Sequence, residues 1–281
     1  RQGGIAAWHD WLCTQQHLTP TLRSDPAAAE RWFGGMSTAL EREGLDLLLC
    51  MQTMGMVLAA TARPNIVAAR TAIDYLFGQP EALDTLETLG LGGFKADATP
   101  IGQLRRQNLL LGSVLQSLGL LPFHDLFLTR PQEGLGGASP RAEAVLRALS
   151  CGPVGIGDGP AGTDTDLIAS LVSRRGKLLH PDHAPFPTPD SLGLDVEIYE
   201  TARVADAERW RYVVALNTSA RAASFSVPHE REEAVIWDAL GRRIVPTMEG
   251  ALAPGEIAYY VVAPLRGGIA PRGRAAGRRA G

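Results

Sequence analysis

Four aspartates mark the places in this sequence where a reaction could be carried out. Asp10 lies in AWHDWL after an apolar start, Asp74 follows NIVAARTAI, Asp125 lies within PFHDLFLT, and Asp158 follows GPVGIG. Each apolar run is typical of a buried strand. In a barrel of parallel strands the catalytic residues sit at the carboxyl ends of the strands. We therefore expect the four carboxylates at or near one edge of a sheet.

A pair of carboxylates at such an edge suits the hydrolysis of glycosides. One carboxylate attacks or stabilises the oxocarbenium-like centre, and the other donates a proton to the leaving oxygen. Trp8 and Trp11 flank Asp10, and an indole ring matches the apolar face of a sugar. The alternative for the two tryptophans is a place in the hydrophobic core.

Residues 1–188 alternate between strand-like and helix-like segments. Asp25 with Pro26, and Ser139 with Pro140, are typical of an N-cap followed by proline at the first helical position. The alternation predicts a parallel sheet with helical crossovers. We expect irregular structure over 78–101 and a loop before residue 65. The expected strands lie at 3–8, 45–51, 65–75, 120–129 and 152–157, and the expected helices at 26–43, 103–118, 140–150 and 164–175, the last ending at a glycine.

The pattern of predicted secondary structure changes after the proline-rich segment HPDHAPFPTPD. Short β-like runs separated by turns follow, at 210–219, 222–228, 234–240, 241–248 and 257–264. This pattern predicts an antiparallel β-sandwich. We therefore expect a fold of the α/β plus all-β class, with one domain over 1–188 and a second over 189–265.

The last segment, 266–281, contains five arginines and no acidic residue. It lacks the apolar side chains that a fold needs, so we expect a disordered, solvated tail rather than a nucleic-acid-binding arm. The rest of the chain has 22 lysines and arginines against 30 acidic residues, a net charge of −8. No apolar stretch reaches the roughly 18 residues that a membrane span requires, and we expect no membrane partner.

Other kinds of site are disfavoured. GDGPAG at 157–162 matches a dinucleotide loop in its glycines, but no second parallel strand follows its helix, and Pro160 removes a backbone N–H. The three cysteines, at 13, 50 and 151, fit neither a disulfide framework nor a metal site, and Cys50 and Cys151 are expected in the core. His180 and His183 lie three apart in a proline-rich segment, which disfavours a metal site.

Several of these segments resemble a known enzyme family. The block at 138–192, with its Gly-Pro-Val strand ending in an aspartate and its later Pro-Thr-x-Asp, resembles the end of the catalytic barrel in glycoside hydrolase family 36, the α-galactosidases and raffinose synthases. PFHDLFLTRP resembles that family's Trp-Asp-Met-Phe element, with His124 in place of tryptophan. NIVAARTAIDY resembles its Arg-x-Ser-Asp-Asp element, and AWHDWL its Gln-Asp-Trp-Leu.

The resemblance implies a (β/α)8 TIM barrel that cleaves or transfers α-galactosyl-type residues with retention, without a metal or organic cofactor. Its substrate would be an oligosaccharide or glycoside. Asp10 matches the nucleophile, and Asp74 lies in the acid/base element. Arg70 matches that element's arginine, and Asp125 and Asp158 match positions near the sugar, where Trp8 and Trp11 would also lie.

Two departures from the family pattern leave alternatives open. Ala72, Ile73 and Asp74 stand where the family has Ser-Asp-Asp, so one carboxylate has become isoleucine. This favours, as the alternative, a carbohydrate-binding relative that has lost turnover; a third possibility is an interaction protein built on the sandwich. On the resemblance the chain holds about strands four to eight of the barrel, so we expect it to be the C-terminal half of a longer enzyme, inactive by itself.

Overall fold

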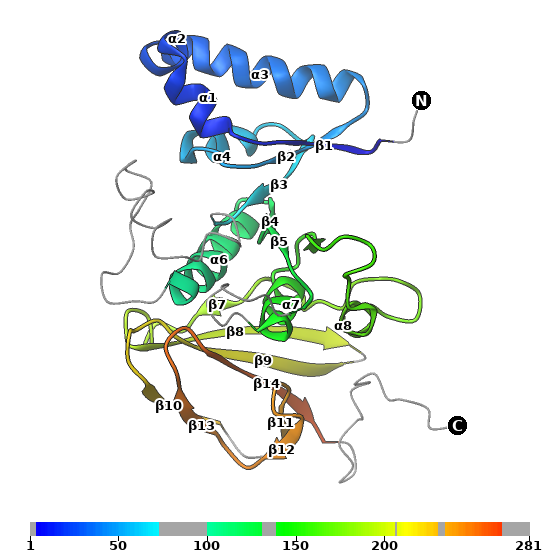
Figure 1. Cartoon of the computed structure of the whole chain (residues 1–281), viewed down its shortest axis with the longest axis vertical. Helices are drawn as coiled ribbons and strands as arrows, with labels where there is room; N and C mark the ends of the chain where they lie inside the picture. The colour runs from blue at the N-terminus through cyan, green and yellow to red at the C-terminus, as the bar shows by residue number, and fades with distance from the viewer. Residues whose placement is uncertain (1–3, 73–99, 131–138, 206, 230–233, 266–281) are drawn as a thin grey trace.

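The computed structural model describes residues 4–72, 100–130, 139–205, 207–229 and 234–265. It contains a parallel sheet with helices, followed by antiparallel strands (Figure 1). In the first part strands alternate with helices as predicted, and short helices that were not predicted occur at 12–18, 20–24 and 54–60. The predicted site residue Asp74, its neighbour Ile73 and the expected tail at 266–281 lie outside the described residues.

The parallel strands follow one another in sequence order. β1 (Ala6–His9), β2 (Asp46–Leu49), β3 (Ile66–Arg70) and β4 (Leu121–Phe123) form a four-stranded parallel sheet. β5 (Leu126–Phe127) pairs in parallel with β6 (Gly155–Ile156). The carboxyl ends of β1 to β4 therefore lie on one side of the four-stranded sheet. Within the described residues the six strands form two separate pieces of sheet, so the predicted half of a (β/α)8 barrel is not confirmed.

The helices connect these strands. Asp25 caps the long helix α3 by accepting a hydrogen bond from the N–H of Ala27 (2.9 Å), and Ser139 caps α7, both as predicted. The predicted loop before residue 65 is wrong in part, because Thr53 caps a short helix there and Met56, Val57 and Ala60 bury one face of it. The helices are α1 (Leu12–Leu18), α2 (Pro20–Ser24), α3 (Pro26–Arg42), α4 (Met54–Ala60), α6 (Pro100–Ser117), α7 (Pro140–Leu149) and α8 (Thr165–Leu171).

Helix α8 ends earlier than predicted. The sequence suggested a helix running to a glycine, but α8 stops at Leu171. Val172 then pairs with Leu178 in an isolated antiparallel bridge. Gly176 adopts a positive φ of 73° and closes a tight turn instead of a helix.

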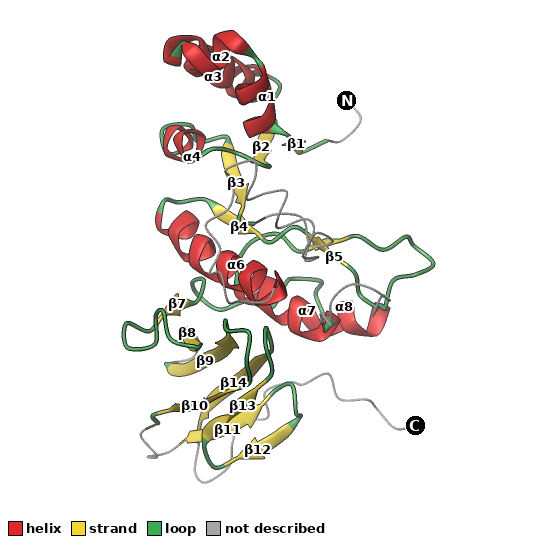
Figure 2. Cartoon of the chain, turned by 60° about the vertical axis from the view of Figure 1, so that its left-hand side comes forward, coloured by secondary structure: helices red, strands yellow, loops and turns green. Residues whose placement is uncertain are grey.

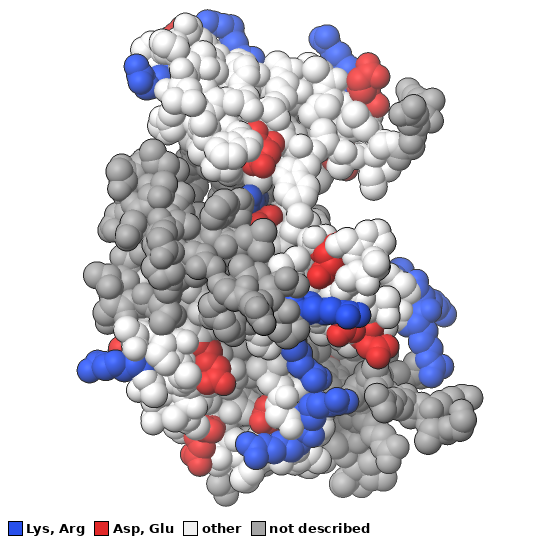
Figure 3. All heavy atoms as spheres, in the orientation of Figure 1, with Lys and Arg blue, Asp and Glu red and all other residues white. Residues whose placement is uncertain are grey.

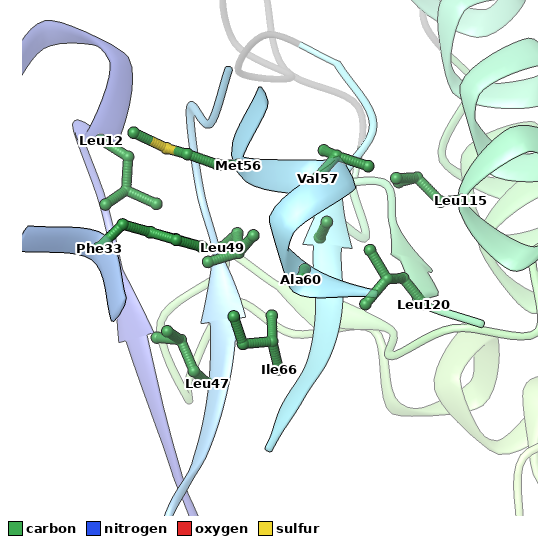
Figure 4. Close-up of a cluster of buried hydrophobic side chains, with 11 residues drawn as sticks. Leu12, Phe33, Leu47, Leu49, Met56, Val57, Ala60, Ile66, Leu115 and Leu120 are labelled. Carbon is green, nitrogen blue, oxygen red and sulfur yellow. The ribbon is translucent and has the colours of Figure 1, made fainter. Parts of the chain in front are cut away.

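One hydrophobic cluster holds the parallel sheet against its helices (Figure 4). Leucines of α1 and β2 meet Phe33 of α3, while α4 covers β3. This core fixes the positions of the carboxyl ends of β1, β2 and β3. Its buried members are Leu12, Phe33, Leu47, Leu49, Met56, Val57, Ala60, Ile66, Ala69, Leu115 and Leu120.

The antiparallel strands form two sheets that share a core. Val213 and Ala215 of the larger sheet and Val227 and Met248 of the smaller one are buried in the same cluster. The larger sheet has the order β12-β11-β14-β9-β8-β7, and the smaller pairs β10 with β13. The strands are β7 (Phe186–Pro187), β8 (Val196–Ala205), β9 (Glu208–Asn217), β10 (Ala223–Val227), β11 (Ala234–Asp238), β12 (Arg243–Val245), β13 (Met248–Leu252) and β14 (Ile257–Pro264).

Helices α6 and α7 lie between the parallel strands and the larger antiparallel sheet (Figure 2). Leu109 and Leu146 of these helices are buried in one cluster with Tyr199, Val214 and Leu216 of the sheet. The two parts of the chain are thereby joined through apolar contacts. The predicted domain limits at 188/189 and 265/266 stay predictions.

Candidate active site at the carboxyl ends of the parallel strands

Three of the four strand ends of the parallel sheet carry residues with unusual backbone geometry. Trp11 after β1, Met51 after β2 and Asp125 after β4 have φ values of 59°, 51° and 66°. Residues other than glycine seldom adopt this left-handed backbone conformation, and those that do are found disproportionately at functional sites. The unusual geometry therefore points to the same edge of the sheet as the aspartates of the sequence.

Asp10 lies in the first of these turns with its side chain exposed. The left-handed Trp11 turns the chain from β1 into α1, and its N–H donates to Oδ1 of Asp10 (2.7 Å). The Gln15 side chain donates to the Asp10 backbone carbonyl (3.2 Å). The carboxylate is thus oriented at one oxygen and remains accessible to a ligand.

Cys50 connects Asp10 with Arg70. The thiol of Cys50, which is fully buried at the end of β2, lies beside the Asp10 carboxylate and the Trp8 indole. Nη1 of Arg70, at the end of β3, donates to its sulfur (3.1 Å). Burial first, and then the neighbouring Asp10 carboxylate, raise the pKa of the thiol to about 11. At neutral pH the thiol is therefore protonated and can donate to Asp10.

We expect Cys50 to resist alkylation in the folded protein. At pH 8 a thiol with a pKa of about 11 is ionised in roughly one molecule in a thousand, and only the thiolate reacts. Iodoacetamide should therefore modify Cys50 at least about 100-fold more slowly in the native than in the urea-unfolded chain, as measured by peptide mass spectrometry. Equal rates in the two states would contradict this account of the thiol.

Arg70 and Asp125 form a buried ion pair. Nη2 of Arg70 lies 3.3 Å from Oδ2 of Asp125, and the side chains are 3% and 11% exposed. The amide of Gln52 donates to the Arg70 carbonyl (2.7 Å). Asp10, Cys50, Arg70 and Asp125 consequently form a continuous row across four neighbouring strand ends, named here the strand-end row.

The two tryptophans beside Asp10 are not core residues of the described structure. Trp8 is 45% and Trp11 57% exposed. The Trp8 ring meets Phe123 of β4 edge-on at a centroid distance of 4.9 Å, which fixes its orientation. Both indoles offer exposed aromatic surface next to the strand-end row.

Asp158 binds the backbone of a neighbouring loop rather than a residue of the strand-end row. Its Oδ2 accepts a hydrogen bond from the N–H of Thr129 (2.7 Å), and the Thr129 hydroxyl accepts one from the N–H of Asp164, the N-cap of α8. These bonds fasten the loops that follow β5 and β6 to each other. The structure thus brings Asp10, Arg70 and Asp125 together and gives Asp158 a role in loop geometry.

His124 directly follows β4 and is buried against helix α6, with its ring next to Gly112. Burial, and then the positive charge of Arg147, lower the pKa of its imidazole from 6.5 to about 3, against the opposing effects of the Glu143 charge and of the nearby Asn108 backbone. The ring is therefore neutral in the folded protein at ordinary pH.

This neutral histidine predicts a loss of stability in acid. The unfolded chain binds a proton at His124 below pH 6.5, while the folded chain does so only near pH 3. As the pH is lowered from 6.5 to 3, the free energy of unfolding should therefore fall by about 1.4 kcal/mol for each pH unit. Urea unfolding from pH 7 to pH 4, compared with a His124→Gln variant, measures this contribution. Parallel curves for the two proteins would contradict it.

No group of three or more potential metal-binding side chains occurs in the described part of the chain. None of the described helices is long and apolar enough to cross a membrane. On the face shown in Figure 3, the upper part around α1 to α4 is mostly uncharged, while acidic and basic side chains lie close together lower down.

Comparison with known proteins gives structural similarities at low sequence identity. The chain is similar to a protein provisionally classed as an α-galactosidase from Bacteroides fragilis (12% identity, TM-score 0.41, 82% of this chain and 57% of that one). It is also similar to an Anoxybacillus α-amylase (13% identity, TM-score 0.35, 84% and 57%) and to AmyP in complex with maltotriose (10%, 0.31, 79% and 42%). No protein-family model and no curated protein matches the sequence. The chain thus spans 57% or less of the length of these three proteins.

Proposed function

We propose that this chain carries the strand-end part of the active site of a retaining glycoside hydrolase or transglycosidase, which acts on α-galactosyl-type sugars within a longer enzyme. The observation that supports this best is the strand-end row, in which an exposed, oriented Asp10 is connected through Cys50 to a buried Arg70–Asp125 pair. The choice of α-galactosyl sugars comes from the sequence resemblance.

The proposed reaction assigns Asp10 the part of nucleophile. Its free oxygen attacks the anomeric carbon while the glycosidic bond breaks, giving a covalent glycosyl-enzyme. The leaving oxygen takes a proton from a second carboxylic acid, for which Asp74 is the candidate. Water or another sugar then attacks the same carbon from the opposite side, gives its proton to the Asp74 carboxylate and displaces Asp10, so the configuration is retained.

The other residues of the site would hold the sugar. Arg70 donates and Asp125 accepts hydrogen bonds, so the pair can contact neighbouring hydroxyl groups of one ring. The exposed indoles of Trp8 and Trp11 provide apolar surface for the ring's carbon face. The N–H of Trp11 keeps Asp10 oriented by donating to it, and the protonated Cys50 lies beside the carboxylate without adding a second negative charge.

A second candidate is a carbohydrate-binding relative without turnover. Ile73 favours it, because the isoleucine stands where the family has a carboxylate. Loss of a general acid removes about 10²- to 10⁴-fold of rate without removing the sugar pocket.

Incubation of the full-length protein with an aryl α-galactoside separates the two candidates. Proton NMR of the first product would show the α-anomer if a retaining enzyme acts. Binding of galactose measured by calorimetry, without any release of the aryl group, would support the carbohydrate-binding relative. A β-anomer as first product would overturn the double-displacement mechanism, and neither binding nor turnover would overturn both candidates.

A further inference from the structure

Arg147 of helix α7 is buried directly behind Asp125. Only 1% of its surface is exposed, and its guanidinium carbon lies 4.9 Å from the centroid of the Phe127 ring. Its nitrogens donate to the backbone carbonyls of three consecutive residues: Nε to Asp125 (3.0 Å), and Nη2 to His124 (2.9 Å) and Leu126 (3.4 Å). A side chain that binds three successive carbonyls holds the course of the backbone at that point.

The backbone needs such support because the strand is interrupted here. β4 ends at Phe123 and pairs with β3, while β5 begins at Leu126 and pairs with β6. Asp125, between them, has a φ of 66°. An aspartate tolerates this conformation better than most residues, but it is still unfavourable. The same kink places the Asp125 carboxylate 3.3 Å from the Arg70 guanidinium.

Arg147 is itself held by a buried carboxylate. Oε2 of Glu143 accepts a hydrogen bond from Nη1 of Arg147 (2.7 Å), and Oε1 accepts one from Nε of Arg105 in α6 (2.8 Å). Burial alone would raise the pKa of Glu143, but the charges of Arg105 and Arg147 lower it, so the group is ionised. Arg105 also donates to the carbonyl of Gly255, in the turn between β13 and β14 (2.6 Å).

We propose that Arg147 is a positioning residue for the sugar site. It fixes the kink at Asp125 and thereby sets that carboxylate against Arg70, while Glu143 and Arg105 tie the kink to the antiparallel sheet. The proposal rests on the proposed function for its link to sugar binding. The antiparallel part of the chain thus contributes to the geometry of the site without touching the sugar.

A double-mutant cycle tests whether Arg147 acts through Asp125. Arg147→Lys keeps the charge but loses the planar group of donors. In the full-length protein we expect it to raise KM for the aryl α-galactoside by about 10- to 100-fold, because small misplacements of binding groups have such effects. In an Asp125→Asn background the same substitution should add less than about twofold. Equal losses in both backgrounds would overturn the proposal.

Arg106→Lys is the matched control. Arg106 lies next to Arg105 in α6 and also reaches the antiparallel sheet, where its Nε donates to Glu197 at 2.9 and 3.0 Å. We expect an unchanged KM for this variant. If Arg147→Lys does not fold, the same measurements are made on Glu143→Asp. The shorter side chain keeps the negative charge but moves the carboxylate that binds Arg147, and so shifts the guanidinium away from the kink.

Hydrogen exchange tests the positioning separately from the proposed function. Deuterium uptake at residues 123–127 should increase in Arg147→Lys and stay unchanged in Arg106→Lys, whether or not the protein cleaves galactosides. Increased uptake with no sugar binding by the wild-type protein would leave the support of the kink intact and reject the function. Unchanged uptake would overturn the positioning itself.

Discussion

An Asp10→Asn variant of the full-length protein is expected to lose at least about 10³-fold in kcat on an aryl α-galactoside, because an amide cannot form the glycosyl-enzyme. The fold around the site should persist. The amide oxygen still accepts the hydrogen bond that the Trp11 N–H donates to Asp10, and the substitution conserves volume. The initial rate of aryl release, measured beside the melting temperature, gives the result.

Asp25→Asn provides the control for this prediction. Asp25 is also an aspartate whose Oδ1 accepts a backbone N–H, that of Ala27 at 2.9 Å, but it caps helix α3. Asparagine caps helices as well as aspartate does, so activity should remain at the wild-type level. Near-wild-type activity of Asp10→Asn would exclude Asp10 as nucleophile.

Glu143→Gln is expected to destabilise the protein by about 3–5 kcal/mol, because it leaves two buried guanidinium groups without their counter-charge. Glu143 has no exposed surface, and Arg105 and Arg147 are 3% and 1% exposed. The glutamine has the size of the glutamate, so the effect reports the lost charge and not a cavity. Urea unfolding at pH 7 measures the change.

Glu200→Gln is the comparison for a partly exposed pair. Glu200 binds Arg211 across β8 and β9, with side chains 30% and 27% exposed. Pairs at the protein surface contribute about 1 kcal/mol or less, so this variant should unfold near the wild-type urea concentration. Similar losses of stability for Glu143→Gln and Glu200→Gln would contradict the importance of burial for the ion pairs of Glu143 with Arg105 and Arg147.

The sequence predicted the parallel part well where local signals are strong. Buried strands appear as continuous apolar runs, and Asp25–Pro26 and Ser139–Pro140 mark helix starts by chemistry that acts over three residues. The antiparallel strand β8 was missed, although VEIYETARVA is rich in β-branched residues. The short helix α4 was missed because its seven residues are too few to show a period.

The candidate site was predicted in part. Asp10, Arg70 and Asp125 were selected from strand ends and from the family resemblance, and the structure brings them together. The prediction that Cys50 is buried is confirmed, but its place beside Asp10 was missed, since an apolar run does not reveal which of its side chains meets a carboxylate. Its place directly after a strand was the available signal.

The support behind Asp125 could not be predicted from the sequence. Arg105 is 38 positions from Glu143 and 150 from Gly255, and Arg147 is 22 from Asp125. Contacts over such separations depend on how helices and sheets pack, and one sequence has no local pattern that encodes them. The break between β4 and β5 was likewise hidden in a run that reads as a single strand.

The most direct test of the central claim is to trap the glycosyl-enzyme. A fluorinated α-galactoside with a good leaving group, which slows the second step, is incubated with the full-length protein, and the digested protein is examined by mass spectrometry. We predict a single sugar attached to the peptide that contains Asp10, and no label in Asp10→Asn. A label on another carboxylate, or turnover of the reagent without any covalent adduct, would contradict the assignment of Asp10 as the nucleophile.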